Sequence, residues 1–261
     1  MVASVNRLSN WSRARRITHK LMDAAPFTLE NTTDAPAAFH AAPCSVSLDV
    51  RLGDCMDIMA TFPDGYFDLA IVDPPYGIGQ HGGHSNTQHT VRAAWDNETP
   101  PQEYWNELFR VSRNQIVWGG NYFEMPPRRG WIVWDKRPMP PSFASCELAW
   151  TSYDRNAATW SGKTGNEVPV ADRIHPTQKP VKLYAWLLAN YAEKGQRILD
   201  THMGSGSIAI AAHYAGVNLT ACEIDPGYHA AAVARIERET RQADFFSSQN
   251  GEHSNTPTQN P

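Results

Sequence analysis

Residues 67–76 read FDLAIVDPPY, an apolar run that ends in a carboxylate, two prolines and a tyrosine. A short apolar run bounded by turn residues is typical of a buried strand. The carboxylate and the rigid turn stand directly after the strand, and open α/β sheets bind their ligands at the carboxyl ends of strands. The stretch therefore predicts an α/β fold with a polar site at residues 73–76.

A second cluster, residues 197–207, reads RILDTHMGSGS and predicts a strand, a glycine turn and the start of a helix. Two glycines at such a turn let the backbone approach a ligand closely, and a helix N-terminus favours a negative group. Glu223 follows Gly204 by nineteen residues, at the end of the next predicted strand, where an acid bonds ribose hydroxyls in nucleotide-binding folds. A simple strand–helix turn followed by an exposed Glu is the alternative, but it leaves the pairing with residues 73–76 unexplained.

Strands and helices alternate along the middle of the chain, which indicates a mostly parallel twisted sheet with helices on both faces. The predicted strands are residues 46–52, 67–72, 115–118, 131–134, 147–153, 197–200 and 219–224. The predicted helices are residues 57–62, 101–111, 181–191, 207–214 and 226–241.

The composition suits one large α/β domain: 261 residues, 41% of them hydrophobic, with a formal net charge of −4. The acidic balance weighs mildly against nucleic-acid binding, although local charge matters more than the sum. No apolar run approaches a membrane span. The four cysteines lack C-x-x-C spacing, so neither a disulfide framework nor a zinc site is expected, and a reducing cytoplasm is favoured.

Three parts of the chain are predicted. Residues 1–45 form an N-terminal extension that we expect to be flexible, residues 46–242 form the folded domain, and residues 243–261 form a polar, disordered tail. Within the domain, loops at about 80–100, 124–145 and 154–172 are expected to carry recognition of the substrate. Histidines in the first loop are spaced too loosely for a metal site, which favours a mobile loop.

The two clusters together resemble the DNA amino-methyltransferases that use S-adenosylmethionine, and the Asp-Pro-Pro-Tyr motif is similar to that of the adenine-N6 enzymes. The amine-site motif precedes the glycine motif by about 130 residues, an order similar to the circularly permuted "beta" group. Residues 53–55 (GDC), 118–123 (WGGNYF) and 175–180 (HPTQKP) also resemble segments of this family, the second of them as in small phage and prophage enzymes. His202 departs from the family, which often has Phe there.

The resemblance implies a Rossmann-like class I methyltransferase fold, S-adenosylmethionine as cofactor with S-adenosylhomocysteine as product, and no metal. In the amine site, Asp73 and the Pro74 carbonyl would each accept an amino hydrogen, Pro75 would stiffen the turn, and Tyr76 would stack on a flipped base. The residues expected to bind the cofactor are Asp54, Cys55, Thr177, Lys179, Asp200, Thr201, Gly204, Ser205, Gly206, Ser207 and Glu223.

The resemblance implies double-stranded DNA as the substrate, in the cytoplasm of a bacterial or phage-infected cell. A homodimer and a cognate restriction enzyme are compatible with this class, and no membrane partner is expected. Three alternatives stay open at this point. An N4-cytosine methylase would use the same amine chemistry. An enzyme acting on an RNA base or a protein glutamine typically shows Asn-Pro-Pro-Tyr after the glycine motif, the reverse of the order here. A catalytically silent DNA-binding module would be expected to lose one of the two clusters.

Overall fold

The structure is a computed structural model of the chain, and it describes residues 46–78, 96, 98–138, 144–162, 174–175 and 177–249, the last eight by backbone only. All of these residues belong to one compact unit, Pro43–Pro261. The predicted extension 1–45, most of the loop 80–100 with its histidines, and the end of the predicted tail lie outside the described residues.

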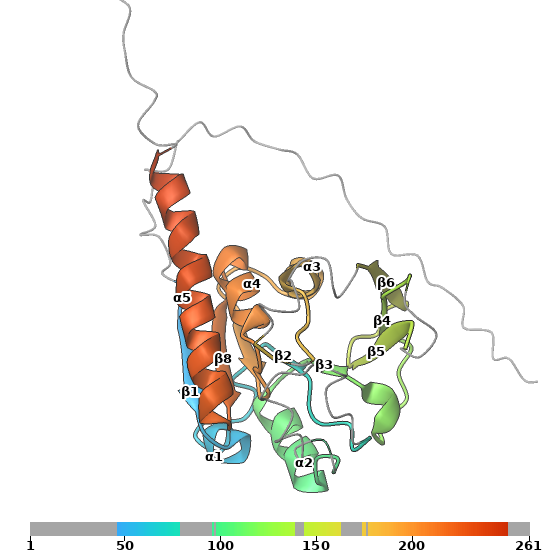
Figure 1. Cartoon of the computed structure of the whole chain (residues 1–261). Helices are drawn as coiled ribbons and strands as arrows, with labels where there is room; N and C mark the ends of the chain where they lie inside the picture. The colour runs from blue at the N-terminus through green and yellow to red at the C-terminus, as the bar shows by residue number, and fades with distance from the viewer. Residues whose placement is uncertain are drawn as a thin grey trace, which may run out of the picture. The chain divides into compact units, whose positions relative to one another are not determined.

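Eight strands form one sheet in the order β1-β8-β7-β2-β3-β5-β4-β6 (Figure 1). The strands are β1 (Leu48–Leu52), β2 (Leu69–Val72), β3 (Gln115–Trp118), β4 (Trp131–Asp135), β5 (Cys146–Thr151), β6 (Ala158–Ser161), β7 (Arg197–Asp200) and β8 (Asn218–Glu223). The pairs from β1 through β3 are parallel, β5 is antiparallel to both of its neighbours, and β6 is parallel to β4. The predicted mostly parallel α/β sheet is confirmed.

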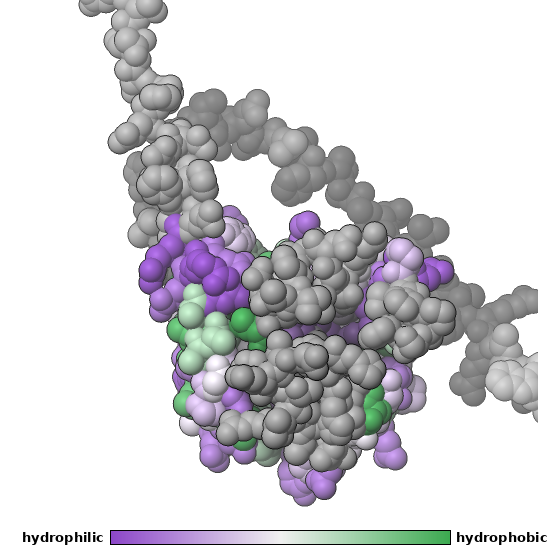
Figure 2. Space-filling view, viewed as in Figure 1, coloured by the Kyte–Doolittle hydropathy of each residue, from purple (hydrophilic) through white to green (hydrophobic). Residues whose placement is uncertain are grey.

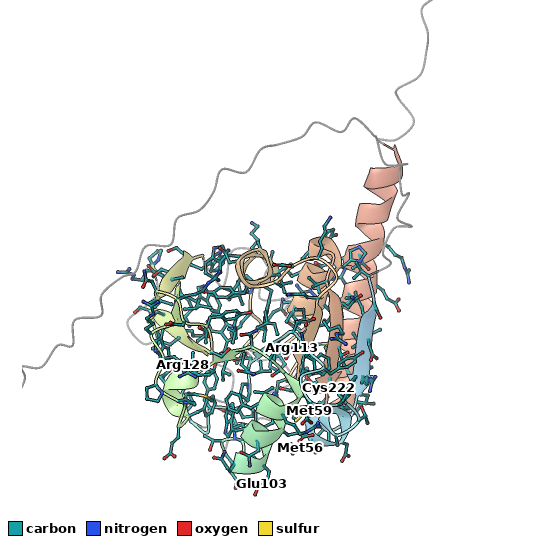
Figure 3. The ribbon with its side chains drawn as sticks, turned by 180° about the vertical axis from the view of Figure 1, so that it is seen from behind. Met56, Met59, Glu103, Arg113, Arg128 and Cys222 are labelled. Atoms are coloured by element: carbon teal, nitrogen blue, oxygen red, sulfur yellow. The ribbon has the colours of Figure 1, made fainter. Side chains whose placement is uncertain are left out.

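Helices cover both faces of this sheet, as Figure 1 shows. They are α1 (Cys55–Met59), α2 (Gln102–Val111), α3 (Val181–Tyr191), α4 (Ser207–Ala215) and α5 (Pro226–Gln249), with a 3₁₀ turn at Gly120–Tyr122. Figure 3 shows α1 and α2 from the opposite side, with Met59 and Glu103 marked on them.

Strand β2 explains why both faces are covered. All four of its residues are buried, and successive side chains in a strand point to opposite faces. Leu69 and Ile71 pack in the core beneath α3 and α4, whereas Ala70 and Val72 pack in the second core with α1 and α2. A strand buried on both faces needs an uninterrupted apolar run, which is what the sequence supplies.

Two sequence predictions need correction. The predicted loop 154–172 contains β6, which pairs with β4. The strand predicted at residues 131–134, within the segment 124–145, is confirmed as β4. β6 has four residues with an alternating burial pattern, too short a signal to separate from the polar residues around it. Helix α5 runs to Gln249, past the predicted start of the tail at residue 243, because no Gly or Pro interrupts residues 228–249 despite their polar composition.

Figure 2 shows hydrophilic residues gathered over part of α5. Glu237, Arg238 and Arg241 of this helix are exposed. Glu237 and Arg241 form an i,i+4 ion pair at 2.8 Å, which supports this exposed part of the helix. No helix among the described residues is long and apolar enough to cross a bilayer.

The fold creates a switch point between two adjacent strands, β7 and β2. From β2 the chain passes through α2 to β3 on one side, and from β7 it passes through α4 to β8 on the other. Open α/β sheets bind ligands in the crevice outside the carboxyl ends of the strands at such a point. The two sequence clusters follow these two strands directly.

Candidate active site

A cavity of about 630 Å³ lies beyond the carboxyl ends of β2 and β7. Residues from both clusters line it, although Asp73 and Gly204 are 131 positions apart in the sequence. The lining comprises residues 73–76 after β2, residues 202–205 and 207 after β7, residues 223–226 and Tyr228 after β8, His175, residues 177–179 and Tyr184 around the start of α3, Asp96 and Glu147. The sheet topology therefore brings the predicted amine site and the predicted glycine turn into one cavity.

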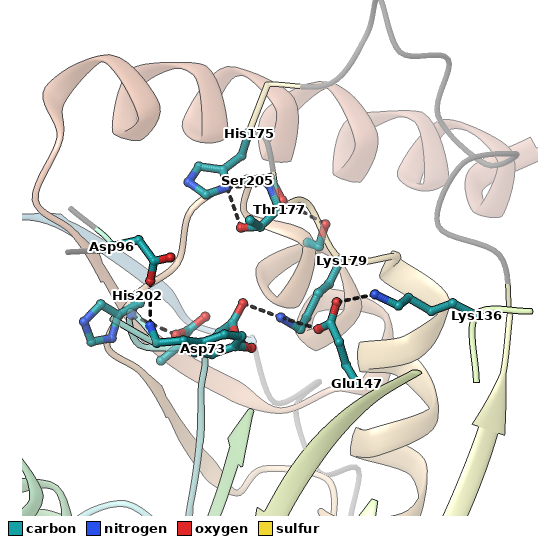
Figure 4. Close-up of polar contacts among 12 residues, drawn as sticks. Asp73, Asp96, Lys136, Glu147, His175, Thr177, Lys179, His202 and Ser205 are labelled. Carbon is teal, nitrogen blue, oxygen red and sulfur yellow. Dashed lines mark hydrogen bonds and ion pairs between the residues drawn. The ribbon is translucent and has the colours of Figure 1, made fainter. Parts of the chain in front are cut away.

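The Asp73 carboxylate is hydrogen-bonded through both oxygens (Figure 4). Its Oδ1 accepts from the Tyr76 hydroxyl at 2.6 Å, and its Oδ2 accepts from the Lys179 ammonium. The turn is closed by Asp96, whose Oδ1 accepts from the backbone N–H groups of Tyr76 at 2.7 Å and of Gly77 at 3.1 Å. Burial, together with Asp73, raises the pKa of Tyr76 well above its ordinary value, so this phenol stays protonated and donates.

The Tyr76 ring packs against the segment that follows β3. Tyr122 stacks on it, with ring centroids 5.0 Å apart and planes 15° from parallel. Gly119 has φ +68° and lies so close that a Cβ there would overlap the Tyr76 ring. The stretch 118–123, which the sequence indicated only through a family resemblance, thus fixes the position of the amine-site tyrosine.

Backbone N–H groups hold Glu223 at the other side of the cavity. One carboxylate oxygen accepts from Gly204 N at 2.9 Å and the other from Asp225 N at 3.0 Å. Gly206 opens helix α4 in the left-handed region, with φ +73°, which is the backbone role that glycine serves at such turns. The acid and the glycine turn are therefore joined directly, and the contact of Glu223 with a ribose stays a prediction.

Arg235 of α5 stabilises the same glycine turn through hydrogen bonds. Its guanidinium donates to the Ser205 carbonyl at 3.0 Å and to the Ser207 hydroxyl at 2.9 Å, and it also pairs with Glu239 at 3.0 Å. The side chain is buried, so these bonds replace its hydration. The sequence analysis missed Arg235, because a single Arg in an amphipathic helix carries no distinguishing signal.

Burial changes the charges of three groups beside the cavity. It lowers the pKa of His175 and of His202 to about 4 against the opposing effect of Asp73, so both rings are neutral at pH 7. It raises the pKa of Asp200 to about 7, although the backbone N–H of His202 donates to Asp200 at 3.0 Å and opposes the rise. Among the described residues that line the cavity, Lys179 supplies the positive charge, against the carboxylates Asp73, Asp96, Glu147, Glu223 and Asp225. This excess of carboxylates favours a cationic ligand.

Five of the predicted cofactor residues do not line the cavity: Asp54, Cys55, Asp200, Thr201 and Gly206. Asp54 caps α1 by accepting from Met56 N at 2.7 Å, and Thr201 bonds the Tyr104 hydroxyl at 2.7 Å. Burial raises the pKa of Cys55 to about 12, so it is no thiolate nucleophile. The direct contact of these five residues with a cofactor stays a prediction.

Thr177 and Lys179 do line the cavity, and the Thr177 hydroxyl lies 3.1 Å from His175 Nδ1. Glu147 and Asp96 were missed by the sequence analysis. For Glu147 the signal was present, since a carboxylate in the apolar strand CELAWT is unusual unless it is paired. Within the part of the chain that the structure describes, no group of three or more metal-ligating side chains occurs.

Comparison with known proteins finds similarity to DNA methylases. Residues 126–234 match the N6/N4 methyltransferase family model, described as DNA methylase. The chain is 26% identical to the putative methylase YubD of Escherichia coli K12 over 204 residues, which is 70% of this chain and 88% of that protein. It is 24% identical to the type II methyltransferase M2.MboI of Moraxella bovis over 217 residues, 63% of this chain and 78% of the relative. These matches support a DNA N4/N6 methyltransferase.

The fold of this chain is similar to that of solved DNA methyltransferases. The PvuII DNA methyltransferase, which is cytosine-N4-specific, superimposes with a TM-score of 0.51 at 14% identity, covering 78% of this chain and 96% of that one. TTHA0409, a putative DNA modification methylase from Thermus thermophilus solved with S-adenosyl-L-methionine, gives a TM-score of 0.49 at 18% identity, covering 75% and 95%. The predicted class I methyltransferase fold is confirmed.

Proposed function

We propose that this methyltransferase transfers the methyl group of S-adenosylmethionine to the N6 amine of an adenine that is flipped out of duplex DNA. One observation carries the proposal: the Asp73–Tyr76 turn and the Gly204–Glu223 pair line the same cavity. A methyl donor bound at the glycine turn and an amine bound at Asp73 would therefore meet without a large movement of the fold.

The cofactor half of the cavity suits a sulfonium nucleoside. Each Glu223 oxygen accepts one backbone hydrogen bond, and a carboxylate offers about four lone-pair sites, so capacity is left for two ribose hydroxyls. The surrounding carboxylates and the neutral ring of His175 favour the positive charge of the sulfonium. The product S-adenosylhomocysteine has lost that charge, which weakens its hold and assists its release.

The amine half supplies acceptors rather than a nucleophile. An exocyclic amine is poorly nucleophilic while its lone pair is delocalised into the ring, and acceptors at Asp73 and the Pro74 carbonyl would draw the lone pair out of conjugation. Bound S-adenosylmethionine would supply the methyl group and leave as S-adenosylhomocysteine, which keeps the bonding pair on sulfur, and the proton released by the amine would pass by way of the Asp73 carboxylate to solvent. The gain comes from positioning and preorganised dipoles. Tyr76 would stack on the base, a contact worth about 1–3 kcal/mol.

The choice of adenine over cytosine rests on the Asp-Pro-Pro-Tyr motif, which resembles that of adenine-N6 enzymes. An N4-cytosine amine would use the same acceptors and the same cofactor, so it is the competing substrate. Cognate restriction activity in the cell and dimer formation stay predictions.

The test is transfer of labelled methyl from S-adenosylmethionine to unmethylated duplex DNA, followed by analysis of the product nucleosides, with Asp73→Ala alongside. The proposal predicts N6-methyladenine that disappears in the variant. N4-methylcytosine would keep the site and replace the substrate. No transfer to any DNA by a protein that binds the cofactor would overturn the proposal.

A further inference from the structure

Four charged side chains of alternating sign form a continuous series from the end of β4 to the amine site (Figure 4). Lys136, directly after β4, pairs with Glu147 of β5 at 2.8 Å. Glu147 also pairs with Lys179 at 3.3 Å, and Lys179 pairs with Asp73. These four residues, here called the charge chain, come from four separate segments of the fold.

The two lysines of the charge chain are buried, unlike those of a surface ion-pair network. The Lys179 side chain is 4% exposed and the Lys136 side chain 9%. Isolated charges at such positions are costly, and they persist only when they are paired with good geometry. Burial by itself opposes the charge on Glu147 and on Lys179, yet their partners prevail, so the pKa of Glu147 is lowered and that of Lys179 is raised. Both are therefore ionised at neutral pH.

An ammonium on a four-carbon stem is free to pivot unless it is held from several sides. Lys179 is held by Asp73 at the end of β2, by Glu147 on β5 and by the Trp118 ring on β3, whose centroid lies 5.2 Å from Nζ. Lys179 in turn acts electrostatically on His175 and Asp200, lowering the pKa of each. Since Nζ has three hydrogens and no acceptor, it can serve both carboxylates at once.

We propose that Glu147 and Lys136 are positioning residues for methyl transfer: they fix the Lys179 ammonium, which holds the Asp73 carboxylate in the orientation that accepts the amino hydrogen of the target base. The inference rests on the proposed function and assigns to that site a residue of β5 and a residue directly after β4, two strands that do not carry the motifs. The Asp73 carboxylate then accepts hydrogen bonds from the Tyr76 hydroxyl and the Lys179 ammonium. Its remaining lone pairs can accept a hydrogen bond from a group bound in the cavity.

The primary test compares Glu147→Gln with Glu237→Gln, which makes the same chemical change at an exposed ion pair on α5. A misplacement of about 1 Å costs on the order of 10²-fold in rate, so we expect the single-turnover rate of Glu147→Gln to fall about 10- to 100-fold at saturating cofactor and DNA. Affinity for S-adenosylmethionine should be unchanged in both variants, and Glu237→Gln should match the unmodified enzyme in rate.

The pH profile separates positioning from a loss of folding. Without the Glu147 charge, burial opposes the Lys179 charge and only one adjacent carboxylate supports it, so the pKa of Lys179 falls. The rate of Glu147→Gln should therefore decline as pH rises through a range in which the unmodified enzyme is constant. Glu147→Asp, which restores the charge, should recover part of the rate and return the profile toward that of the unmodified enzyme.

A readout without DNA separates this inference from the proposed function. The side-chain ammonium of Lys179, assigned by its loss in Lys179→Met, should give a protected ¹⁵N–¹H signal in the unliganded protein that Lys136→Met weakens and Glu147→Gln abolishes. If the unmodified enzyme methylates no DNA, the proposed function fails and so does a role in transfer, whatever the signal shows. An active enzyme whose rate, pH profile and ammonium signal all survive Glu147→Gln would overturn the inference.

Discussion

The two sides of the cavity are built differently. On the cofactor side, Glu223 is held by the backbone N–H groups of Gly204 and Asp225, all within one strand–helix–strand unit. On the amine side, Asp73 is held by side chains, and its bond to Lys179 joins residues 106 positions apart. The comparison teaches that one half of this site is made by local backbone geometry and the other half by the order of strands in the sheet.

The largest expected effect is on the rate of methyl transfer, and it comes from a substitution that alters only the amine side of the cavity. Asp73→Asn keeps the shape of the side chain but turns one of its oxygens into a donor, which faces the Lys179 ammonium or the target amine. Loss of one preorganised group typically costs about 10²–10³-fold in rate, so we expect single-turnover transfer to fall by that amount. Cofactor affinity, measured by calorimetry, should stay within experimental error of the unmodified protein. An equal loss of cofactor affinity would show that the two sides are not separable.

The complementary substitution alters only the cofactor side of the cavity and should lower the affinity for the cofactor. Glu223→Gln keeps one acceptor and removes the charge, and hydrogen bonds to charged groups contribute about 1.5–3 kcal/mol. Cofactor affinity should therefore fall roughly 10- to 100-fold, while the rate at saturating cofactor changes little. A variant that binds the cofactor normally would contradict the ribose role assigned to Glu223.

Two glycine variants test how tightly the Tyr76 ring is packed on the amine side, through their free energies of unfolding. Gly119 and Gly195 both have φ in the left-handed region, +68° and +80°, where a side chain costs about 1–2 kcal/mol. A Cβ at Gly119 would also overlap the Tyr76 ring, whereas nothing lies within 4 Å of one at Gly195. Gly119→Ala should lose about 1–3 kcal/mol more unfolding free energy than Gly195→Ala, because overpacking is added to the backbone strain. Equal losses in urea denaturation would show that the Tyr76 ring yields without cost.

The smallest expected effect is in the pH dependence of stability. The pKa of Asp200 is raised in the folded state to about 7 from 3.8, so its contribution to stability is present below pH 3.8 and is lost as pH rises through about 7. The pKa values of His175 and His202 are lowered to about 4, so their contributions are present above pH 6.5 and are lost as pH falls through about 4. The opposing trends leave a shallow net profile.

Asp200→Asn isolates the contribution of Asp200 to the pH dependence of stability, because the amide oxygen of the Asn can still accept from the backbone N–H of His202. The unfolding free energy of the variant relative to the unmodified protein should increase from pH 4 to pH 7. The histidine contributions are common to both proteins and cancel in the difference. A difference that is constant across this range would mean that Asp200 is not protonated in the folded state.

The sequence predicted the parallel part of the sheet and the glycine turn, because each depends on neighbouring residues. The run 69–72 is apolar without interruption, and Gly204, Gly206 and Glu223 have the spacing of a nucleotide turn. Helix α3 has the predicted bounds, Val181–Tyr191, since Pro180 precedes it and its apolar residues recur at helical spacing.

The rest depended on distant partners. β6 forms because β4 offers a parallel edge for it, which four residues of alternating burial do not reveal. Lys179 was predicted among the cofactor-binding residues, and its pairing with Asp73 and Glu147 could not be foreseen until β2 and β5 were placed in the sheet. Arg235 likewise acquires its role only where α5 crosses the glycine turn.

The central claim is that one cavity holds the methyl donor and the target amine side by side. A crystal structure of the protein with S-adenosylhomocysteine tests it most directly. The account predicts ribose hydroxyls within hydrogen-bonding distance of Glu223 and the sulfur turned toward the Asp73–Tyr76 turn. A ligand bound elsewhere, or bound here with its sulfur turned away from Asp73, would contradict it.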